Sequence, residues 1–394
     1  MGRGVKMHKS SDIIIIGGGV IGSSVAYNLL RDGYTGQVTV FEKDIIYEYS
    51  STPRSAGGIR QLFTTAINIQ ISRYSLQKYK TFPEDMAIGN ERAEIDFKQR
   101  GYLFLAKNKD LQQLEQQSLL QQKFGVPSEL LTKEELLTII PELTIDDLNG
   151  GLYCGEDGYL DPYSVMQGYA RKAKQLGAEY IYETIDSINQ DGNKVTGVKP
   201  ANGDIHKAPI VINCAGPWAP ALSEKMDLPL PIVPLKRQII QFDIAEPLVN
   251  DLPLTVDPTG VYFRHEGASL IAGYSEAVQP GIDFKWKRSF FLEQLWPILG
   301  HRISNFERAK ISSGWAGMYS YNTEDQNAII GQHPQLNGYY IACGFSGHGM
   351  QQAPAVGKGL SELIQLGKYE TLDLSSLRFE RFAESDLVIE GAIV

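Results

Sequence analysis

A glycine-rich turn near the start of the chain is the feature that most constrains its fold. Residues 13–16 are all isoleucine, which predicts a buried parallel strand. The glycines that follow, Gly17, Gly19 and Gly22, fit the pattern G-x-G-x-x-G. The first would make a tight turn, the second would let the backbone approach a pyrophosphate, and the third would let a helix pack on the strand.

A second predicted strand, residues 38–41, ends in Glu42, twenty residues after Gly22. An acidic residue at this position can accept a hydrogen bond from a ribose hydroxyl, and the N-terminus of the intervening helix would face the phosphate. The strand, helix, second strand and acid together predict a dinucleotide-binding site. The alternative is a glycine-rich turn in an ordinary βαβ unit.

Charge and cysteine content exclude several classes of partner and site. The formal net charge of −9 argues against nucleic acid or anionic lipid as a general partner. No apolar run reaches 18 residues and the first eleven residues are polar, so we expect neither a membrane span nor a signal peptide. The three widely spaced cysteines fit a reducing compartment and no metal site. We therefore expect a cytoplasmic protein.

The rest of the chain, 394 residues in all, is long enough for two or three domains. Residues 50–60 are small, polar and glycine-rich, which suits a loop lying along a ligand. Thr132 and Glu135 form a predicted capping box, and residues 226–320 are mostly strand-like with one helix near 288–299. A predicted strand at 339–343 leads into a second glycine-rich loop, and a helix over 353–366 follows.

Three distant segments together resemble one family. They are the N-terminal glycine pattern, the sequence Cys-Ala-Gly-Pro-Trp-Ala at 214–219 and the sequence Gly-Phe-Ser-Gly-His-Gly-Met at 344–350. The chain resembles the FAD-dependent amine oxidoreductases, which include D-amino-acid oxidase, glycine oxidase, sarcosine oxidase and dimethylglycine dehydrogenase. Residues 55–61 and 315–319 are similar to the sarcosine oxidase beta-subunit branch. A mitochondrial FAD-dependent oxidoreductase-domain protein linked to complex I assembly has similar stretches.

The resemblance implies a mixed α/β (α+β) fold made of two interleaved domains. A Rossmann-like FAD-binding domain would comprise residues 11–90, 150–225 and 325–382. An antiparallel-sheet substrate domain would comprise residues 91–149 and 226–324, and residues 383–394 would form a tail. The second glycine-rich loop favours FAD over NAD, because a helix N-terminus there would stabilise negative charge on the reduced flavin.

The resemblance also implies which residues contact FAD. The pyrophosphate would lie against Gly17, Gly19, Val20, Ile21 and Gly22, and the adenosine against Glu42, Lys43 and Ile185. The loop along the ribityl chain would supply Thr52, Arg54, Ala56, Gly57 and Gly58. Ala215, Gly216 and Trp218 would close over the dinucleotide, although Trp218 could instead be an aromatic residue that packs the domains together. The flavin loop would be Gly344, Phe345, Ser346, Gly347, His348, Gly349 and Met350, with His348 either bonded to the flavin or only packed.

Four residues are candidates for the substrate pocket. Arg60 matches the arginine of sarcosine oxidase that binds the substrate carboxylate, and a surface or phosphate-binding arginine is the alternative. Guanidinium pairs with carboxylate in a bidentate manner. Tyr319 follows the Trp-Ala-Gly segment, where family members place a pocket residue. Tyr262 and Arg264 lie on an alternating predicted strand and are either pocket residues or ordinary sheet residues.

The sequence departs from the sarcosine oxidase pattern at three positions. Gly317 stands in place of the cysteine that links the flavin covalently, which implies noncovalent FAD. Gln351 stands in place of a second carboxylate-binding lysine. Ile271 stands at about the position of the lysine that activates oxygen, which favours a dehydrogenase over an oxidase unless another cation, Arg264 or Lys236, substitutes for it.

We therefore expect an FAD-dependent enzyme that oxidises the C–N bond of a small amino acid, N-methylated or not, by hydride transfer. Its partners would be this substrate and an electron acceptor or partner subunit. Two alternatives stay open. One is an FAD-dependent dehydrogenase of a hydroxy acid or of glycerol-3-phosphate, and the other is a noncatalytic FAD-binding assembly factor.

Overall fold

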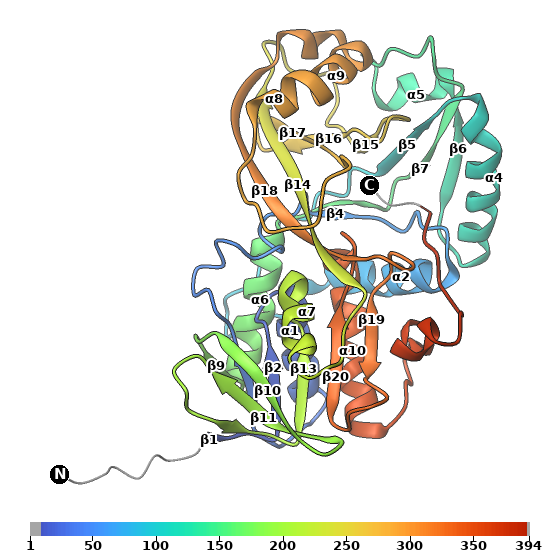
Figure 1. Ribbon diagram of the computed structural model, residues 1–394. Helices are drawn as coiled ribbons and strands as arrows, with labels where there is room; N and C mark the ends of the chain where they lie inside the picture. Colours follow the sequence, from blue (N-terminus) through green and yellow to red (C-terminus); the bar gives the residue numbers. More distant parts are fainter. Residues whose placement is uncertain (1–8, 392–394) are drawn as a thin grey trace.

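The computed structural model describes residues 9–391 and places them in two lobes (Figure 1). One lobe is built on a six-stranded sheet and the other on an eight-stranded sheet. The chain passes between the lobes several times, so each sheet combines segments that are distant in sequence. This mixture of parallel and antiparallel sheets with helices confirms the predicted α/β class. The expectations for residues 1–8 and 392–394 lie outside the described residues.

The six-stranded sheet contains the strands predicted around the first glycine-rich turn. In spatial order its strands are β19 (Ile329–Gln332), β20 (Tyr339–Cys343), β13 (Ile210–Asn213), β2 (Ile13–Ile16), β3 (Val38–Phe41) and β9 (Glu179–Ile181). All pair in parallel except β19 with β20. Strand β2 lies near the centre and is buried on both faces, since Ile13 and Ile15 belong to one hydrophobic cluster and Ile14 and Ile16 to another.

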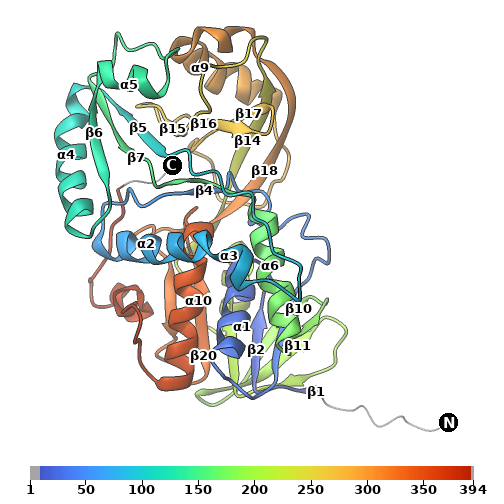
Figure 2. The ribbon, with the colours of Figure 1, turned by 180° about the vertical axis from the view of Figure 1, so that it is seen from behind.

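Helices cover one face of this sheet, as the view from behind shows (Figure 2). They are α1 (Val20–Arg31), α6 (Pro162–Gln175) and α10 (Gly349–Leu366), with α2 (Ala66–Lys80) and α3 (Phe82–Asp85) beside them. The opposite face is covered by α7 (Ala219–Glu224) and a four-stranded sheet made of β1 (Lys9–Ser10), β12 (His206–Lys207), β11 (Lys194–Pro200) and β10 (Ile185–Asp191). The first turn of α6 is capped by the Asp161 carboxylate, which accepts hydrogen bonds from the N–H groups of Tyr163 and Ser164.

The eight-stranded sheet forms the second lobe. In spatial order its strands are β18 (Lys310–Asn322), β14 (Ile232–Asp243), β17 (Ser269–Tyr274), β16 (Tyr262–Glu266), β15 (Leu254–Val256), β5 (Tyr102–Ala106), β7 (Gly150–Cys154) and β6 (Ser128–Thr132). Its helices are α4 (Asn108–Lys123), α5 (Lys133–Ile139), α8 (Arg288–Phe290) and α9 (Trp296–Arg302). Leu103 and Leu105 of β5 pack with α5, α8 and α9, whereas Tyr102 belongs to a second cluster with Leu62 and Phe63.

Three expectations can be compared with individual contacts. The capping box at Thr132 and Glu135 is confirmed, because each side chain accepts a hydrogen bond from the backbone N–H of the other residue. Strand β7 pairs with β5 and β6, so residues 150–154, expected in the FAD-binding domain, belong to the eight-stranded sheet. The remaining domain boundaries stay a prediction.

The expected tail is packed against the fold over residues 383–391. Glu390 is 2% exposed, and its carboxylate accepts hydrogen bonds from Thr64, Thr65 and Asn68. Local sequence could not predict this contact, because it joins residues more than 300 positions apart. It places the Glu390 carboxylate at the N-terminus of α2, where a negative charge is favourable.

No helix within residues 9–391 has both the length and the apolar character needed to cross a membrane. The same residues contain no group of three or more His, Cys, Asp or Glu side chains that could hold a metal ion.

Candidate functional site

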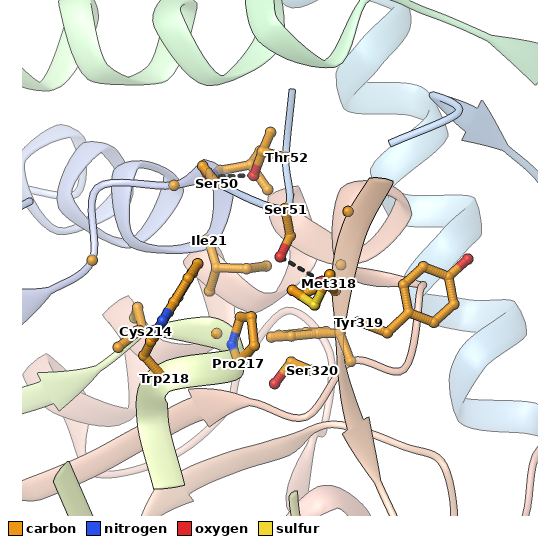
Figure 3. Close-up of a pocket in the computed structure, with 18 of the residues that line it drawn as sticks. Ile21, Ser50, Ser51, Thr52, Cys214, Pro217, Trp218, Met318, Tyr319 and Ser320 are labelled. Atoms are coloured by element: carbon orange, nitrogen blue, oxygen red, sulfur yellow. Dashed lines mark hydrogen bonds between the residues drawn. The ribbon is translucent and has the colours of Figure 1, made fainter. Parts of the chain in front are cut away.

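A cavity of about 480 Å³ lies between the two sheets and is lined by residues of both. Its volume falls within the range of small-molecule and cofactor sites. It runs from the glycine-rich turn after β2 to the strands β14, β16 and β18. Figure 3 shows part of this lining, with Ile21 between Trp218 and Met318, and with Tyr319 further along the strand that carries Met318.

The three glycines of the first turn are needed for different reasons. A Cβ atom at Gly17 would lie 2.5 Å from the carbonyl oxygen of Cys214, and one at Gly22 would lie 1.9 Å from the carbonyl oxygen of Gly17. A Cβ atom at Gly19, in contrast, would have its nearest neighbour, the Thr52 hydroxyl, at 3.5 Å. The protein itself therefore leaves room at Gly19, which lines the cavity. A glycine there fits a phosphate group that approaches the backbone.

The end of β3 supplies an acid and a cation to the cavity. The Glu42 carboxylate accepts hydrogen bonds from the backbone N–H groups of Gly18 at 2.8 Å and Asp44 at 2.9 Å. Burial raises the pKa of Glu42, and the two hydrogen bonds lower it by a smaller amount. The carboxylate keeps lone pairs that can accept a hydrogen bond from a ribose hydroxyl. The Lys43 ammonium lies 3.2 Å from the centroid of the Trp218 ring, and burial lowers the pKa of Lys43.

The loop expected along the ribityl chain is attached to both lobes. Thr52 accepts a hydrogen bond from the N–H of Val20, and Ser51 donates one to the carbonyl oxygen of Met318. The Arg54 guanidinium donates to the carbonyl oxygens of Glu48 and Ala316. The loop therefore joins the start of α1 to strand β18 and forms one wall of the cavity.

The second glycine-rich loop forms the wall next to α10. Its residues from Phe345 to Met350 line the cavity, and the backbone N–H of Ser346 donates to Ser320 on β18. His348 is buried, and its Nδ1 has no hydrogen-bond partner within residues 9–391. Burial and the charge of Arg60 lower the pKa of His348 to about 3, so the imidazole is neutral at pH 7.

Arg60 lines the cavity directly after β4 (Gly58–Ile59), which pairs with β8 (Gly158–Tyr159). Its side chain is 2% exposed, donates to the carbonyl oxygen of Leu62 and lies over the ring of Phe63 at 4.0 Å. The backbone N–H of Arg60 donates to Oε1 of Gln351, which also lines the cavity. A guanidinium and an amide therefore lie together in the wall of the cavity.

Two of the other three substrate candidates line the same cavity, and one does not. Tyr262 and Tyr319 are lining residues, and burial raises the pKa of both phenols. Arg264 is not a lining residue, which corrects our expectation that it contributes to the pocket. Its guanidinium is paired with Glu266, donates to the carbonyl oxygen of Ala56 and lies over the ring of Tyr159.

The cavity brings together most of the predicted cofactor contacts. The predicted residues that line it are Gly17, Gly19, Val20, Ile21, Glu42, Lys43, Thr52, Arg54, Ala56, Gly58, Ile185, Ala215, Gly216, Trp218, Phe345, Ser346, Gly347, His348, Gly349 and Met350. Gly22, Gly57 and Gly344 are not among the lining residues. A Cβ atom at Gly57 would lie 2.2 Å from the carbonyl oxygen of Leu160, so this glycine serves close packing, as Gly22 does. The individual contacts with FAD stay a prediction.

Two lining cations were missed by the sequence analysis, which considered Arg264 and Lys236 but neither Arg237 nor Lys225, and Lys225 is paired with Asp186. Lys236 is paired with Asp283 and lines a separate cavity, whereas Arg237 lines the large one. The available signal was that Lys236 and Arg237 are adjacent on one predicted strand, because neighbouring residues of a strand face opposite sides of a sheet. Ile271 is buried in β17 and is not a lining residue of the cavity.

Comparison with known proteins agrees with this geometry. The sequence profile described as "FAD dependent oxidoreductase" matches residues 12–363. FAD-dependent oxidoreductase domain-containing protein 1 of Xenopus laevis is 34% identical over 423 residues, which cover 98% of this chain and 85% of that protein. Sarcosine dehydrogenase, mitochondrial, of Homo sapiens is 26% identical over 392 residues, which cover 95% of this chain but 42% of that protein.

Solved structures show the same fold. The crystal structure of L-proline dehydrogenase from P. horikoshii superposes with a TM-score of 0.88 at 32% identity, covering 97% of this chain and 100% of that chain. Glycine oxidase from Geobacillus kaustophilus shares the fold with a TM-score of 0.83 at 23% identity, covering 95% of this chain and 99% of that chain. These matches confirm the resemblance inferred from the three sequence segments. The chain belongs to the FAD-dependent oxidoreductase family, and its cofactor is FAD.

Proposed function

We propose that this oxidoreductase removes two electrons from the C–N bond of a small amino acid whose nitrogen carries an alkyl group. The observation that carries the proposal is the position of Arg60, a buried guanidinium that lines the same cavity as the dinucleotide-binding turn. Arg60 would pair with the substrate carboxylate in a bidentate manner, and the amide of Gln351 would lie beside it.

The other side chains near Arg60 favour orientation over acid–base chemistry. FAD held in this cavity would supply the acceptor for a hydride from the substrate carbon. Tyr262 and Tyr319 are neutral at pH 7, because burial raises the pKa of both. His348 is neutral as well. The role of these residues is therefore to exclude water and to hold the C–H bond in line with its acceptor.

The names of the relatives support an N-alkylated substrate. Sarcosine, dimethylglycine and L-proline, the compounds in the names of three relatives, are all amino acids with an alkyl group on nitrogen. They share a carboxylate one carbon away from the nitrogen, which is the group that Arg60 would bind.

Anaerobic bleaching of the flavin tests the proposal. The holoenzyme is mixed with sarcosine, dimethylglycine, L-proline and glycine, and in parallel with lactate, 2-hydroxyglutarate and glycerol-3-phosphate. We expect bleaching near 450 nm with at least one N-alkylated amino acid. Bleaching by a hydroxy compound alone would assign the chain to C–OH oxidation. No bleaching by any compound would favour the noncatalytic assembly role.

We also propose that the electrons pass to an acceptor other than oxygen, such as a quinone, an electron-transfer flavoprotein or a partner subunit. The support is that Ile271 stands where an oxygen-activating lysine is expected, while Lys236 and Arg264 are each paired with a carboxylate. A preorganised cation is what stabilises developing superoxide charge. Stopped-flow mixing of the reduced enzyme with air-saturated buffer tests this. Reoxidation as fast as turnover would identify an oxidase.

A cytoplasmic location, inferred from the three cysteines, which are free and buried, stays a prediction.

A further inference from the structure

The part of the cavity that the eight-stranded sheet lines has an excess of positive charge. The lining carboxylates, Glu42, Asp44, Glu183 and Asp186, all follow strands of the nucleotide-binding lobe or lie beside them. The lining residues contributed by the eight-stranded sheet are Tyr102, Arg237, Ile239, Leu254, Tyr262 and the β18 residues from Gly317 to Ser320. Arg237 is the one charged residue among them. Arg54, which packs against Gly317, and Arg60 line the cavity as well, so three guanidinium groups lie in this region, while the lining carboxylates among residues 9–391 all belong to the nucleotide-binding lobe.

The Arg237 guanidinium has no carboxylate partner within residues 9–391. Its Nη1 donates to the carbonyl oxygens of Lys236 at 2.9 Å and Glu276 at 3.3 Å. Its Nε is fully buried and has no hydrogen-bond partner among the same residues. A buried N–H group of a charged side chain is costly when it is left without an acceptor.

Other buried cations of this fold show the usual arrangement. Lys236 is paired with Asp283, Arg264 with Glu266, Arg302 with Asp257, and Arg381 with Asp325. Arg237, which is half-buried, differs from these cations in that it has no carboxylate partner among the described residues. Because Arg237 lines the cavity, a ligand in the cavity can supply a carboxylate.

The position of Arg237 is held by the sheet. It lies on β14 between β17 and β18, and its partner across the β14–β18 pair is Gly317, which packs against the side chain of Arg54. The Arg237 Cζ atom lies 5.1 Å from the centroid of the Tyr319 ring. The charges of Arg237 and Arg60 both oppose the rise that burial causes in the pKa of Tyr319. The two guanidinium groups therefore act on one ring from within the same site.

We propose that Arg237 binds a second carboxylate of the substrate, so that the substrate is an amino acid with two carboxylates, one bound by Arg60 and the other by Arg237. This inference rests on the proposed function, because it adds a substrate class to the same site. The candidates are N-carboxyalkyl amino acids such as iminodiacetate. A guanidinium suits this role, since its charge and its planar set of N–H donors match a carboxylate.

Two nonreactive ligands test the inference without turnover. Thiodiacetate has two carboxylates, and (methylthio)acetate has one; sulfur replaces the nitrogen in both, so neither has a C–N bond to oxidise. Each is titrated into the oxidised holoenzyme, and the change in flavin absorbance gives its Kd. We expect thiodiacetate to bind about tenfold more tightly or better, as an additional charge-assisted pair implies. Equal affinities in the wild-type protein would overturn the inference.

Variants assign the difference to Arg237. In Arg237→Gln we expect the advantage of thiodiacetate to disappear, while the Kd of (methylthio)acetate stays within about twofold, because only one charged pair is lost. Arg237→Lys, which keeps the charge and the packing, should keep part of the advantage. Lys236→Gln is the matched control on the opposite face of the same strand and should change neither Kd. A loss of both ligands in Arg237→Gln would mean a structural role and would overturn the inference.

The outcome can be separated from that of the proposed function. If sarcosine bleaches the flavin but thiodiacetate has no advantage, the proposed function stands and the second carboxylate site is wrong. If thiodiacetate shows its Arg237-dependent advantage but no amino acid with one or two carboxylates bleaches the flavin, the site is right and the proposed reaction is wrong.

Discussion

The ring of Tyr319 lies in the space that a side chain at Gly347 would need. A Cβ atom at position 347 would lie 2.6 Å from Cε2 of Tyr319, and Gly347 has a φ of +97°. Gly347 of the predicted flavin loop therefore packs against Tyr319 of the eight-stranded sheet, and both residues line the cavity. This contact connects the position of the substrate pocket to the conformation of the flavin loop.

Gly347→Ala is expected to destabilise the protein by about 2–4 kcal/mol, since it adds overpacking to an unfavourable φ. Gly33→Ala is the matched control, because Gly33 has a φ of +92° with no atom within 4 Å of the added Cβ. The control should cost about 1 kcal/mol from the backbone alone. Chemical unfolding of the three proteins gives the values. Equal losses in the two variants would show that the Tyr319 ring moves aside freely.

Gly19→Leu is expected to abolish FAD binding and leave a folded protein. The protein leaves room for a Cβ atom at Gly19, so a larger side chain would extend into the cavity where the pyrophosphate is expected. Gly22→Ala is the contrasting variant and should lower stability itself, because its Cβ atom would meet the carbonyl oxygen of Gly17. The ratio of absorbance at 450 and 280 nm reports FAD, and circular dichroism reports folding. A normal FAD content in Gly19→Leu would contradict this reading of the turn.

Arg60→Ala is expected to lower kcat/KM by about 100-fold or more, with FAD content near normal. The loss combines a charge-assisted pair with the misorientation of the substrate. Arg60→Lys keeps a charge and part of the packing on Phe63, so it should lose less activity but recover no bidentate contact. If Arg60→Ala loses FAD instead, this arginine serves the cofactor and the carboxylate site lies elsewhere.

Acid precipitation is expected to release the FAD into the supernatant. Gly317 offers no nucleophile for a covalent link, and a Cβ atom there would already lie 3.1 Å from Cβ of Arg54. Cys214 lines the cavity, but burial raises the pKa of its thiol and keeps it protonated. Absorbance spectra of the supernatant and of the redissolved pellet measure the partition. Flavin that stays with the pellet would mean a covalent link through another residue.

The stability of the protein is expected to fall as the pH decreases from about 6.5, the ordinary pKa of histidine, toward about 3. Burial and Arg60 lower the pKa of His348 to about 3 in the folded state, whereas the unfolded chain binds a proton at its ordinary pKa. The unfolded state therefore binds more protons in this window, which favours unfolding. Glu390 also faces His348, and its negative charge opposes the shift.

His348→Gln should reduce this loss of stability, and His301→Gln should leave it unchanged because His301 is exposed. Unfolding in denaturant at pH 7.5 and pH 5 measures both. A wild-type protein that is equally stable at the two pH values, or a His348→Gln variant with the full wild-type loss, would contradict the assignment to His348.

Local patterns predicted the nucleotide-binding half of the site well. The run of isoleucines, the spacing of Gly17, Gly19 and Gly22, and the acid at Glu42 are all local, and the structure places them around one end of the cavity. The packing of the 383–391 segment could not be predicted in this way. Its anchor, Glu390, finds its partners on the turn before α2, and nothing in the adjacent sequence indicates that pairing.

The substrate half depended on pairings that sequence patterns do not reveal. The register that sets Arg237 opposite Gly317 joins strands about 80 residues apart. That Arg237 has no carboxylate partner among residues 9–391 is a property of the assembled site rather than of its neighbours in sequence. Arg264 is different, because Glu266 lies two residues further along the same strand and therefore on the same face. This local ion pair could have been predicted from the sequence, and it indicates that Arg264 does not face the pocket.

The late place of β20 in the chain has a consequence for the synthesis of the protein. Strand β13 ends at Asn213, but its neighbour β20 ends only at Cys343. At about 5–20 residues per second, a ribosome needs roughly 7–26 s to make the chain between them. Throughout that interval β13 presents an unpaired edge, and the loop that completes the cavity does not yet exist. FAD can therefore bind and stabilise the fold only after nearly nine-tenths of the chain has been made. Until then, we expect newly made chains to need protection from association through the unpaired edge of β13.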